Sequence, residues 1–207
     1  MSAARSSPIR VRPIRVRPIR ALPVEAFHDP FTRRLLAHRG LTTELLERRE
    51  RCRLRIRVLE QTPAAPELAD PGLRDVLRLA PGVPALSRRT ELVTPLGRAV
   101  SRNLVLGRVP SDASVAASVT GRTAPLGRAL ARLGVPNRRT LLTTGLGEWP
   151  GPDGAAPAAA REYLIHLAGE APLYVRETFH PAVAPPLPRP GHPALFPGFR
   201  PPLGRTA

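Results

Sequence analysis

The chain has 207 residues, a formal net charge of +16 and one cysteine, and 42% of its residues are hydrophobic. This length fits one domain with tails, and the apolar fraction is high enough for a core. The lone Cys52 excludes an internal disulfide and a cysteine-based zinc or iron–sulfur site, and the five histidines lack ligand-type spacing. We therefore expect no metal and no cofactor. Arg or Pro interrupts every apolar run, so we expect no membrane span.

All 32 basic residues are arginines, and their placement along the chain is uneven. Residues 1–22 and 182–207 together hold nine of them and no acid, whereas all 16 acids lie in 23–181. Attraction to polyanions is then mostly a property of the ends. The absence of Lys, with abundant Ala, Pro and Gly, is typical of a GC-rich coding bias. We expect no specific nucleic-acid partner.

The two ends differ in composition from the middle of the chain. Residues 8–20 read PIRVRPIRVRPIR, and a proline at every fifth position forbids a helix or a paired central strand. We therefore expect a disordered arm over 1–22, a domain over 23–183 and a Pro-rich disordered tail over 184–207. The arm lacks the apolar segment of a secretory signal, so we expect a cytoplasmic location.

Hydrophobic periodicity and turn residues predict the elements of the domain. In chain order they are helices over 31–40 (ending at Gly40) and 41–50 (capped by Thr42 or Thr43), a strand over 51–61, a linker over 62–86, a hairpin over 88–107, helices over 111–119 (capped by Ser111) and 124–134, a strand over 138–144, a loop over 145–159 and a hairpin over 161–181. This order predicts an α+β fold, a mostly antiparallel sheet flanked by helices.

The last strand places a carboxylate among apolar residues. Leu173, Val175, Glu177 and Phe179 share one strand phase. Burying an unpaired carboxylate costs several kcal/mol, so Glu177 is either half of a structural ion pair or a functional group. Both interpretations are open at this point.

Two arginine positions in the preceding hairpin have the same character. Arg102 shares its phase with Val100, Leu104 and Leu106, so it is expected to point inward. Arg88 and Arg89 are adjacent, so one of them must also point inward. Inward Arg and Glu groups could neutralise each other, or they could bind a small molecule with an acid at one end and a hydroxyl at the other.

Four segments, in order along the chain, resemble the chorismate pyruvate-lyase family. They are GLTTELLE (40–47), RRTELVTPLGRAVSRNLVL (88–106), TAPLGRAL (123–130) and AREYLIHLAGEAPLYVRETFHPAV (160–183). The resemblance implies an antiparallel sheet flanked by helices, a fold shared with the UTRA ligand-binding domains of GntR-type regulators. It also implies a buried ligand site beneath helical flaps.

The family's ligand-contacting positions fall on five residues of this chain. The resemblance implies that Arg89, with Arg88 as the alternative, holds the ring carboxylate and that Glu177 meets the ring hydroxyl. It places Leu41 and Leu126 in the flaps and Arg102 near the cavity. The turn of the central hairpin is about two residues shorter than in the best-known members, and this leaves Arg88 and Arg89 as alternatives.

Three functions follow as hypotheses. The first is a cofactor-independent, monomeric lyase that eliminates pyruvate from chorismate to give 4-hydroxybenzoate, with Arg89 and Glu177 as catalytic residues. The second is a non-catalytic UTRA-like domain that binds an aromatic acid. The third is a basic nucleic-acid binder that depends on the tails.

Overall fold

A computed structural model describes residues 18–64, 71–80, 85–152 and 154–187. Its strands are β1 (Arg20–Ala21), β2 (Arg55–Ala64), β3 (Ala85–Val93), β4 (Ala99–Arg108), β5 (Asn137–Gly151), β6 (Gly154–Leu167) and β7 (Leu173–Phe179). Its helices are the 3₁₀ turn η1 (Val24–Ala26) and the α-helices α1 (Pro30–Ala37), α2 (Thr42–Glu50), α3 (Pro71–Val76), α4 (Ala113–Thr120) and α5 (Leu126–Arg132). The predicted α+β class is confirmed.

The strands form one antiparallel sheet with the order β1-β5-β6-β7-β4-β3-β2. The long β5–β6 and β2–β3–β4 segments meet at β7, which pairs with both β4 and β6. The C-terminal strand, which carries Glu177, is therefore the centre of the sheet. This placement explains why β7 is almost entirely buried.

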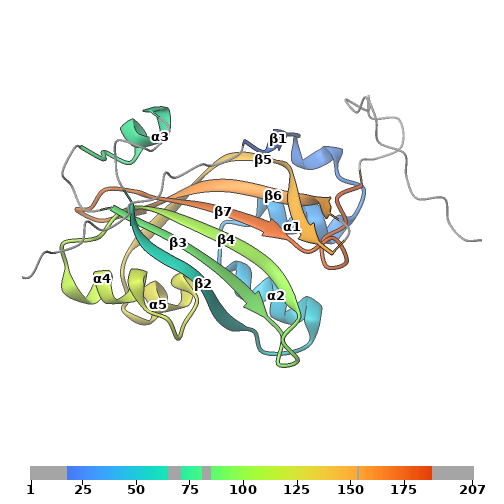
Figure 1. Ribbon diagram of the computed structural model, residues 1–207, viewed down its shortest axis with the longest axis horizontal. Coiled ribbons are helices and arrows are strands. Elements are labelled where there is room, and N and C mark those ends of the chain that lie inside the picture. The colour runs from blue at the N-terminus through green and yellow to red at the C-terminus, as the bar shows by residue number, and fades with distance from the viewer. Residues whose placement is uncertain (1–17, 65–70, 81–84, 153, 188–207) are drawn as a thin grey trace, which may run out of the picture.

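Different helices pack on the two faces of the sheet. One face carries Arg88, Val105, Val175 and Tyr163 in one row across four strands, and we call it the covered face. Its apolar residues pack against α1 and α2 in one cluster and against α4 and α5 in a second. The other, outer face packs against α3 through Leu104, among others. Figure 1 shows α3 on the opposite side of the sheet from α4 and α5.

Side-chain caps set where two of the helices begin. Asp29 accepts a hydrogen bond from the Thr32 N–H at the start of α1, and Pro30 occupies the first helical position. Asp112, rather than the predicted Ser111, caps α4 by accepting from the N–H groups of Ser114 and Val115. The predicted Ser111 cap is therefore wrong, because the Ser111 hydroxyl donates to Glu170 instead.

The largest error in the predicted elements concerns residues 145–159. They continue β5 and begin β6, so a hairpin replaces the expected loop. Small residues also allow β1 to pair closely with β5, since a Cβ on Gly145 would lie 1.9 Å from the Arg20 carbonyl oxygen. The Gly and Ala content that suggested a loop thus serves close contact between strands.

A β-bulge interrupts the alternation of β2. Val58 pairs with Thr90, but Glu60 pairs with Arg89, so Leu59 is the extra residue and its side chain is half exposed. Beyond the bulge, Gln61 lies directly opposite Arg88. The bulge thus changes which residues of β2 reach the covered face.

The packed part of the chain extends past the predicted limits of 23 and 183. Residues 20–21 pair with β5, and Leu22 is buried. At the other end Ala184 is buried, and the carbonyl of Leu187 accepts from the His28 N–H. The rest of the predicted arm and tail, residues 1–17 and 188–207, lies outside the described residues.

Candidate functional site

Glu177 lies on the covered face and is buried, as its strand phase predicts. Its cross-strand neighbour on β6 is Arg161, whose side chain is 1% exposed. The Arg161 Nε donates to Glu177 Oε2 at 2.8 Å, and the hydroxyl of Thr42 donates to the same oxygen at 3.1 Å. The buried carboxylate is thus neutralised by a guanidinium from the adjacent strand.

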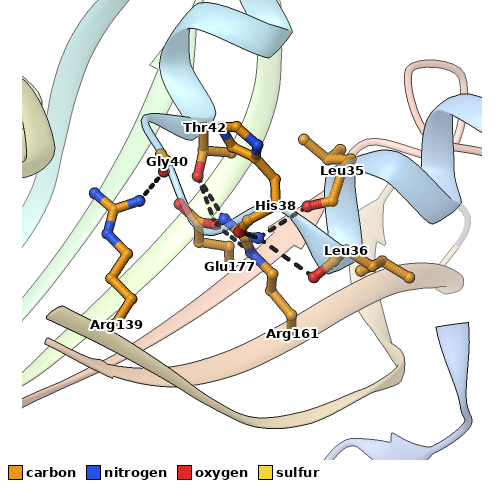
Figure 2. Close-up of polar contacts among 8 residues, drawn as sticks. All are labelled: Leu35, Leu36, His38, Gly40, Thr42, Arg139, Arg161 and Glu177. Atoms are coloured by element: carbon orange, nitrogen blue, oxygen red, sulfur yellow. Dashed lines mark hydrogen bonds and ion pairs between the residues drawn. The ribbon is translucent and has the colours of Figure 1, made fainter.

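Arg161 also holds the link between α1 and α2. Its Nη1 donates to the carbonyls of Leu35, Leu36 and His38 at the end of α1, and its Nη2 donates to the Thr42 hydroxyl at 2.6 Å. Figure 2 shows these carbonyls converging on the guanidinium. Thr42 was a predicted helix cap, but α2 begins after Leu41 without a side-chain cap, because the Thr42 hydroxyl is engaged by Arg161 and Glu177.

The groups around this ion pair have shifted pKa values. Burial and the negative charge of Glu177 raise the pKa of the Tyr163 phenol. Burial, followed by the charges of Arg161 and Arg139, lowers the pKa of His38 below 6.5. The adjoining space between the α1–α2 link and the sheet measures about 10 Å³, no more than one water molecule occupies. This part of the covered face is closed.

Arg88 is the second fully buried arginine of the covered face, with 1% of its surface exposed. Its Nη1 and Nη2 donate to the carbonyls of Val119 and Gly121 at the end of α4. Among the described residues no carboxylate lies within ion-pair distance of it, and its Nε is buried without a partner. Burial, and secondarily the charge of Arg122, lower the pKa of Arg88.

Three more buried polar atoms without a hydrogen-bond partner lie on the covered face, two of them on residues that neighbour Arg88 and one farther along β4. They are Gln61 Oε1, Ser101 Oγ and Asn103 Oδ1. Gln61 is the β2 partner of Arg88, whereas Asn103 pairs with Thr90 and Glu177 on either side. Buried polar atoms are nearly always paired in proteins, so four unpaired atoms on three adjacent strands mark a candidate binding surface.

Two of the arginines predicted for the site point the other way. Arg89 is half exposed on the outer face, 3.6 Å from Glu60, and Arg88 takes the inward position instead. Arg102 also lies on the outer face, where its Nε donates to Glu91 at 2.8 Å and its guanidinium lies over Trp149. The apolar row that it shares with Leu104 and Leu106 packs on the α3 side of the sheet, whereas the covered-face row of β4 carries the polar Ser101 and Asn103.

The two flap residues meet at the edge of the covered face. Leu41 is half-buried, and its Cδ2 would lie 3.0 Å from a Cβ placed on Gly127. Leu126, which directly precedes Gly127 at the start of α5, packs against the apolar cluster beneath α4 and α5. Arg139 fixes this arrangement by donating to the Gly40 carbonyl (Figure 2). The structure thus brings the α1–α2 link and the start of α5 together.

Strand phase contained a signal for one residue that the prediction omitted. Arg161 shares its phase with Tyr163, Ile165 and Leu167, so it is an arginine in an apolar row, like Glu177 on β7. Gln61 could not be identified in this way, because the bulge at Leu59 reverses the phase of β2. Asn103 lies opposite Glu177 only once β4 and β7 are paired.

The described residues contain no cluster of three or more His, Cys, Asp or Glu side chains that could hold a metal ion. In the same part of the chain, no helix is long and apolar enough to cross a membrane.

Comparison with known proteins identifies the fold. The sequence matches no protein-family model and no curated protein. Among solved structures, PhnF from Mycobacterium smegmatis superposes with a TM-score of 0.53 over 71% of this chain at 16% identity, and this chain spans 66% of the length of PhnF.

Two further structures are similar at lower scores. The effector domain of PhnF has a TM-score of 0.49, 18% identity and coverage of 68% of this chain and 88% of that one. The ligand-binding domain of a putative GntR-family regulator from Bordetella bronchiseptica has a TM-score of 0.43, 16% identity and coverage of 61% and 85%. These comparisons do not extend to the chorismate pyruvate-lyases themselves. The chain has a UTRA/chorismate lyase-like fold.

Proposed function

We propose that this chain is a small-molecule-binding domain that takes an organic anion between the covered face of the sheet and the helices above it. The observation that carries the proposal is Arg88, a guanidinium that is 1% exposed and has no carboxylate partner among the described residues. Burying an unpaired charge is costly, and a bound anion would offset that cost. A guanidinium matches the planar shape of a carboxylate.

A purely structural role accounts for only one edge of this guanidinium. Nη1 and Nη2 cap the C-terminus of α4, where cations and donors are favourable. The Nε edge has no partner in that arrangement. Helix capping therefore explains part of the side chain, and anion binding would use the remainder.

A ligand needs a way to the covered face. Arg128 of α5 donates to Glu47 of α2 at 3.0 Å and so joins the two helical flaps, and Arg139 of β5 donates to the Gly40 carbonyl and so ties the α1–α2 link to the sheet. The first contact is partly buried and the second is exposed. We propose that these contacts break when ligand enters and re-form around it. The UTRA-like fold, which the chain shares with PhnF, supports a binding function without catalysis.

Elimination of pyruvate from chorismate is the second candidate, and one observation favours it. Arg88 and Glu177 lie on the same face, two strands and two residues apart, which is about 12 Å between Cα atoms from standard sheet spacings. That separation suits a ring held by its acid and its hydroxyl. The bond between the ring and the enolpyruvyl oxygen would break and a ring proton would pass to water as the ring becomes aromatic, and the released enolpyruvate would take up a proton at carbon to give pyruvate. Glu177, however, is engaged by Arg161.

The binding proposal is tested by calorimetric titration with 4-hydroxybenzoate and with phenylacetate. We expect the wild-type protein and Arg89→Met to bind at least one of these acids, and Arg88→Met to bind neither. The two variants remove the same group from adjacent residues on opposite faces. Equal binding by both variants would exclude Arg88 as the anion site.

The two candidate functions separate in a chorismate assay. The protein is incubated with chorismate, pyruvate is followed by a coupled enzyme, and 4-hydroxybenzoate is measured by chromatography. A binding domain gives neither product above the uncatalysed rate. A lyase gives both in equal amounts, and Arg88→Met and Glu177→Gln each lower its rate by orders of magnitude.

A further inference from the structure

We propose that Gln61 and Asn103 recognise a hydrogen-bond donor that the ligand carries beside its acid group. The ligand class is then a 2-hydroxy acid, or a phosphate or phosphonate that carries its own P–OH. This inference rests on the proposed function, because it presupposes that Arg88 binds the acid. It adds two specificity-determining residues and the chemistry that they select.

The register of the sheet places both amides around Arg88. Gln61 is its direct cross-strand partner on β2, and such pairs have Cβ atoms about 5 Å apart. Asn103 is its diagonal neighbour on β4, at about 7–8 Å. A group bound to the free Nε of Arg88 would therefore lie within reach of amides from both neighbouring strands.

The chemistry of the unpaired atoms selects what the ligand must bring. Gln61 Oε1 and Asn103 Oδ1 are buried acceptors without partners. A carboxylate only accepts hydrogen bonds, so, with the two amides oriented as they are here, a simple carboxylate on Arg88 would leave both amide oxygens unpaired. A ligand with a donor beside its acid group satisfies the guanidinium and an amide together.

The charges around the site favour an uncharged donor, such as a hydroxyl, over an ammonium group. Arg88 is cationic, and the nearby carboxylates are engaged elsewhere. Glu177 is paired with Arg161, and Glu91 lies on the outer face between Arg57 and Arg102. An ammonium group beside Arg88 would meet like charge with nothing to balance it, whereas a hydroxyl adds no charge.

The test compares ligands that differ only in the hydroxyl. Phenylacetate and each enantiomer of mandelate are titrated into the wild-type protein by calorimetry, with inorganic phosphate as a further arm. We expect one mandelate enantiomer to bind about tenfold more tightly than phenylacetate, which corresponds to one hydrogen bond to a buried group. Phosphate binding more tightly than mandelate would support the inference and identify a P–OH as the donor.

Two variants test whether the amides of Gln61 and Asn103 cause the preference for mandelate over phenylacetate. In Gln61→Leu or Asn103→Leu we expect the mandelate preference to fall below about threefold while phenylacetate affinity is kept. Thr62→Val, which changes the neighbouring residue on the other side of β2, should keep the full preference. Both Leu variants remove an unpaired buried acceptor, so they are expected to unfold at no lower urea concentration than the wild type.

The outcomes separate the two proposals. Mandelate and phenylacetate binding equally well to the wild type would overturn the recognition of a donor, and so would a preference that survives in both Leu variants. The Arg88 site would stand in either case. If no acid binds the wild type at all, the proposed function is wrong, and this inference is overturned with it.

Discussion

Two buried arginines on one face of the sheet have opposite surroundings. Arg161 has Glu177, the Thr42 hydroxyl and three carbonyls at the end of α1 as acceptors. Arg88 has two carbonyls at the end of α4 and no carboxylate among the described residues. Both are 1% exposed. The difference teaches that burial alone does not identify a binding residue: a fully paired arginine serves the structure, and an incompletely paired one can receive a ligand.

The largest loss of stability is expected at Arg161, the arginine that is fully paired. Arg161→Met leaves Glu177 buried without a cation and several carbonyls without a donor, which should cost about 3–5 kcal/mol of unfolding free energy. Urea denaturation at pH 7 measures this loss.

A double variant checks the reason for that loss. Replacing the carboxylate as well, in Arg161→Met/Glu177→Gln, removes the stranded charge, so the double variant should be more stable than Arg161→Met alone. If the single variant loses less than about 1 kcal/mol, the ion pair does not hold the α1–α2 link as described.

A smaller effect is expected at the incompletely paired arginine. Arg88→Met removes two hydrogen bonds at the end of α4 but also removes a buried unpaired charge, so the net loss should be about 1–2 kcal/mol. The same denaturation experiment on Arg89→Met, at an exposed position, should give a change within about 0.5 kcal/mol. A loss at Arg88 as large as that at Arg161 would mean that the two sites are equally structural.

Glu47 of α2 is a third buried charged group, and it accepts hydrogen bonds from Arg128 of α5 across the contact between the two helices. Burial tends to raise the pKa of its carboxyl, but hydrogen bonds from Arg128 and the Leu54 N–H bring the pKa below 4.5. The folded state therefore holds the proton less tightly than the unfolded state. Its stabilisation is full above pH 4.5 and is lost as the pH falls through the folded pKa.

Glu47→Gln should consequently destabilise the protein by about 1–2 kcal/mol at pH 7, with the difference from wild type shrinking below pH 4.5. Urea denaturation from pH 7 to pH 3.5 follows this difference. Glu44→Gln, whose carboxylate lies 3.9 Å from Arg48 on the surface, should show no measurable change. A pH-independent loss in Glu47→Gln would show that packing rather than charge is responsible.

The smallest effect is expected at His38 on the α1–α2 link. Burial and the charges of Arg161 and Arg139 lower its pKa below 6.5, so the folded state disfavours the protonated ring. Wild-type stability should fall as the pH drops below 6.5, because the unfolded state binds the proton more readily. His38→Gln should reduce this slope between pH 7.5 and 5.5 in thermal denaturation. Identical pH dependence of stability in the wild type and in His38→Gln would contradict the lowered pKa of His38.

The elements of the sheet that alternate regularly could be predicted from the sequence. The hairpins β3–β4 and β6–β7 and the inward phase of Glu177 follow from a period of two. The extension of β5 and β6 through 145–159 could not be predicted, because Gly and Ala are typical of loops until the neighbouring strand is known. Local composition says little about how closely two strands approach.

The candidate site was predicted in part, for a physical reason. A period of two separates the residues of a strand into two faces, but it does not say which face the helices cover. The apolar row of β4, with Leu104 and Leu106, faces α3 on the outer side, so Arg102 was assigned to the wrong face. Arg88 and Arg89 were left as alternatives, and the register with β2 and β4 was needed to choose between them.

The bulge at Leu59 determines which side chain of β2 lies opposite Arg88. If β2 paired regularly, with Leu59 opposite Arg89, Glu60 would lie opposite Arg88, and a carboxylate of the chain itself would take the position that we propose for the ligand's acid group. With the bulge at Leu59, Glu60 stays beside Arg89 and a neutral amide occupies that position. A β2 strand without the bulge would therefore neutralise Arg88 within the sheet, and the proposed anion site would be lost.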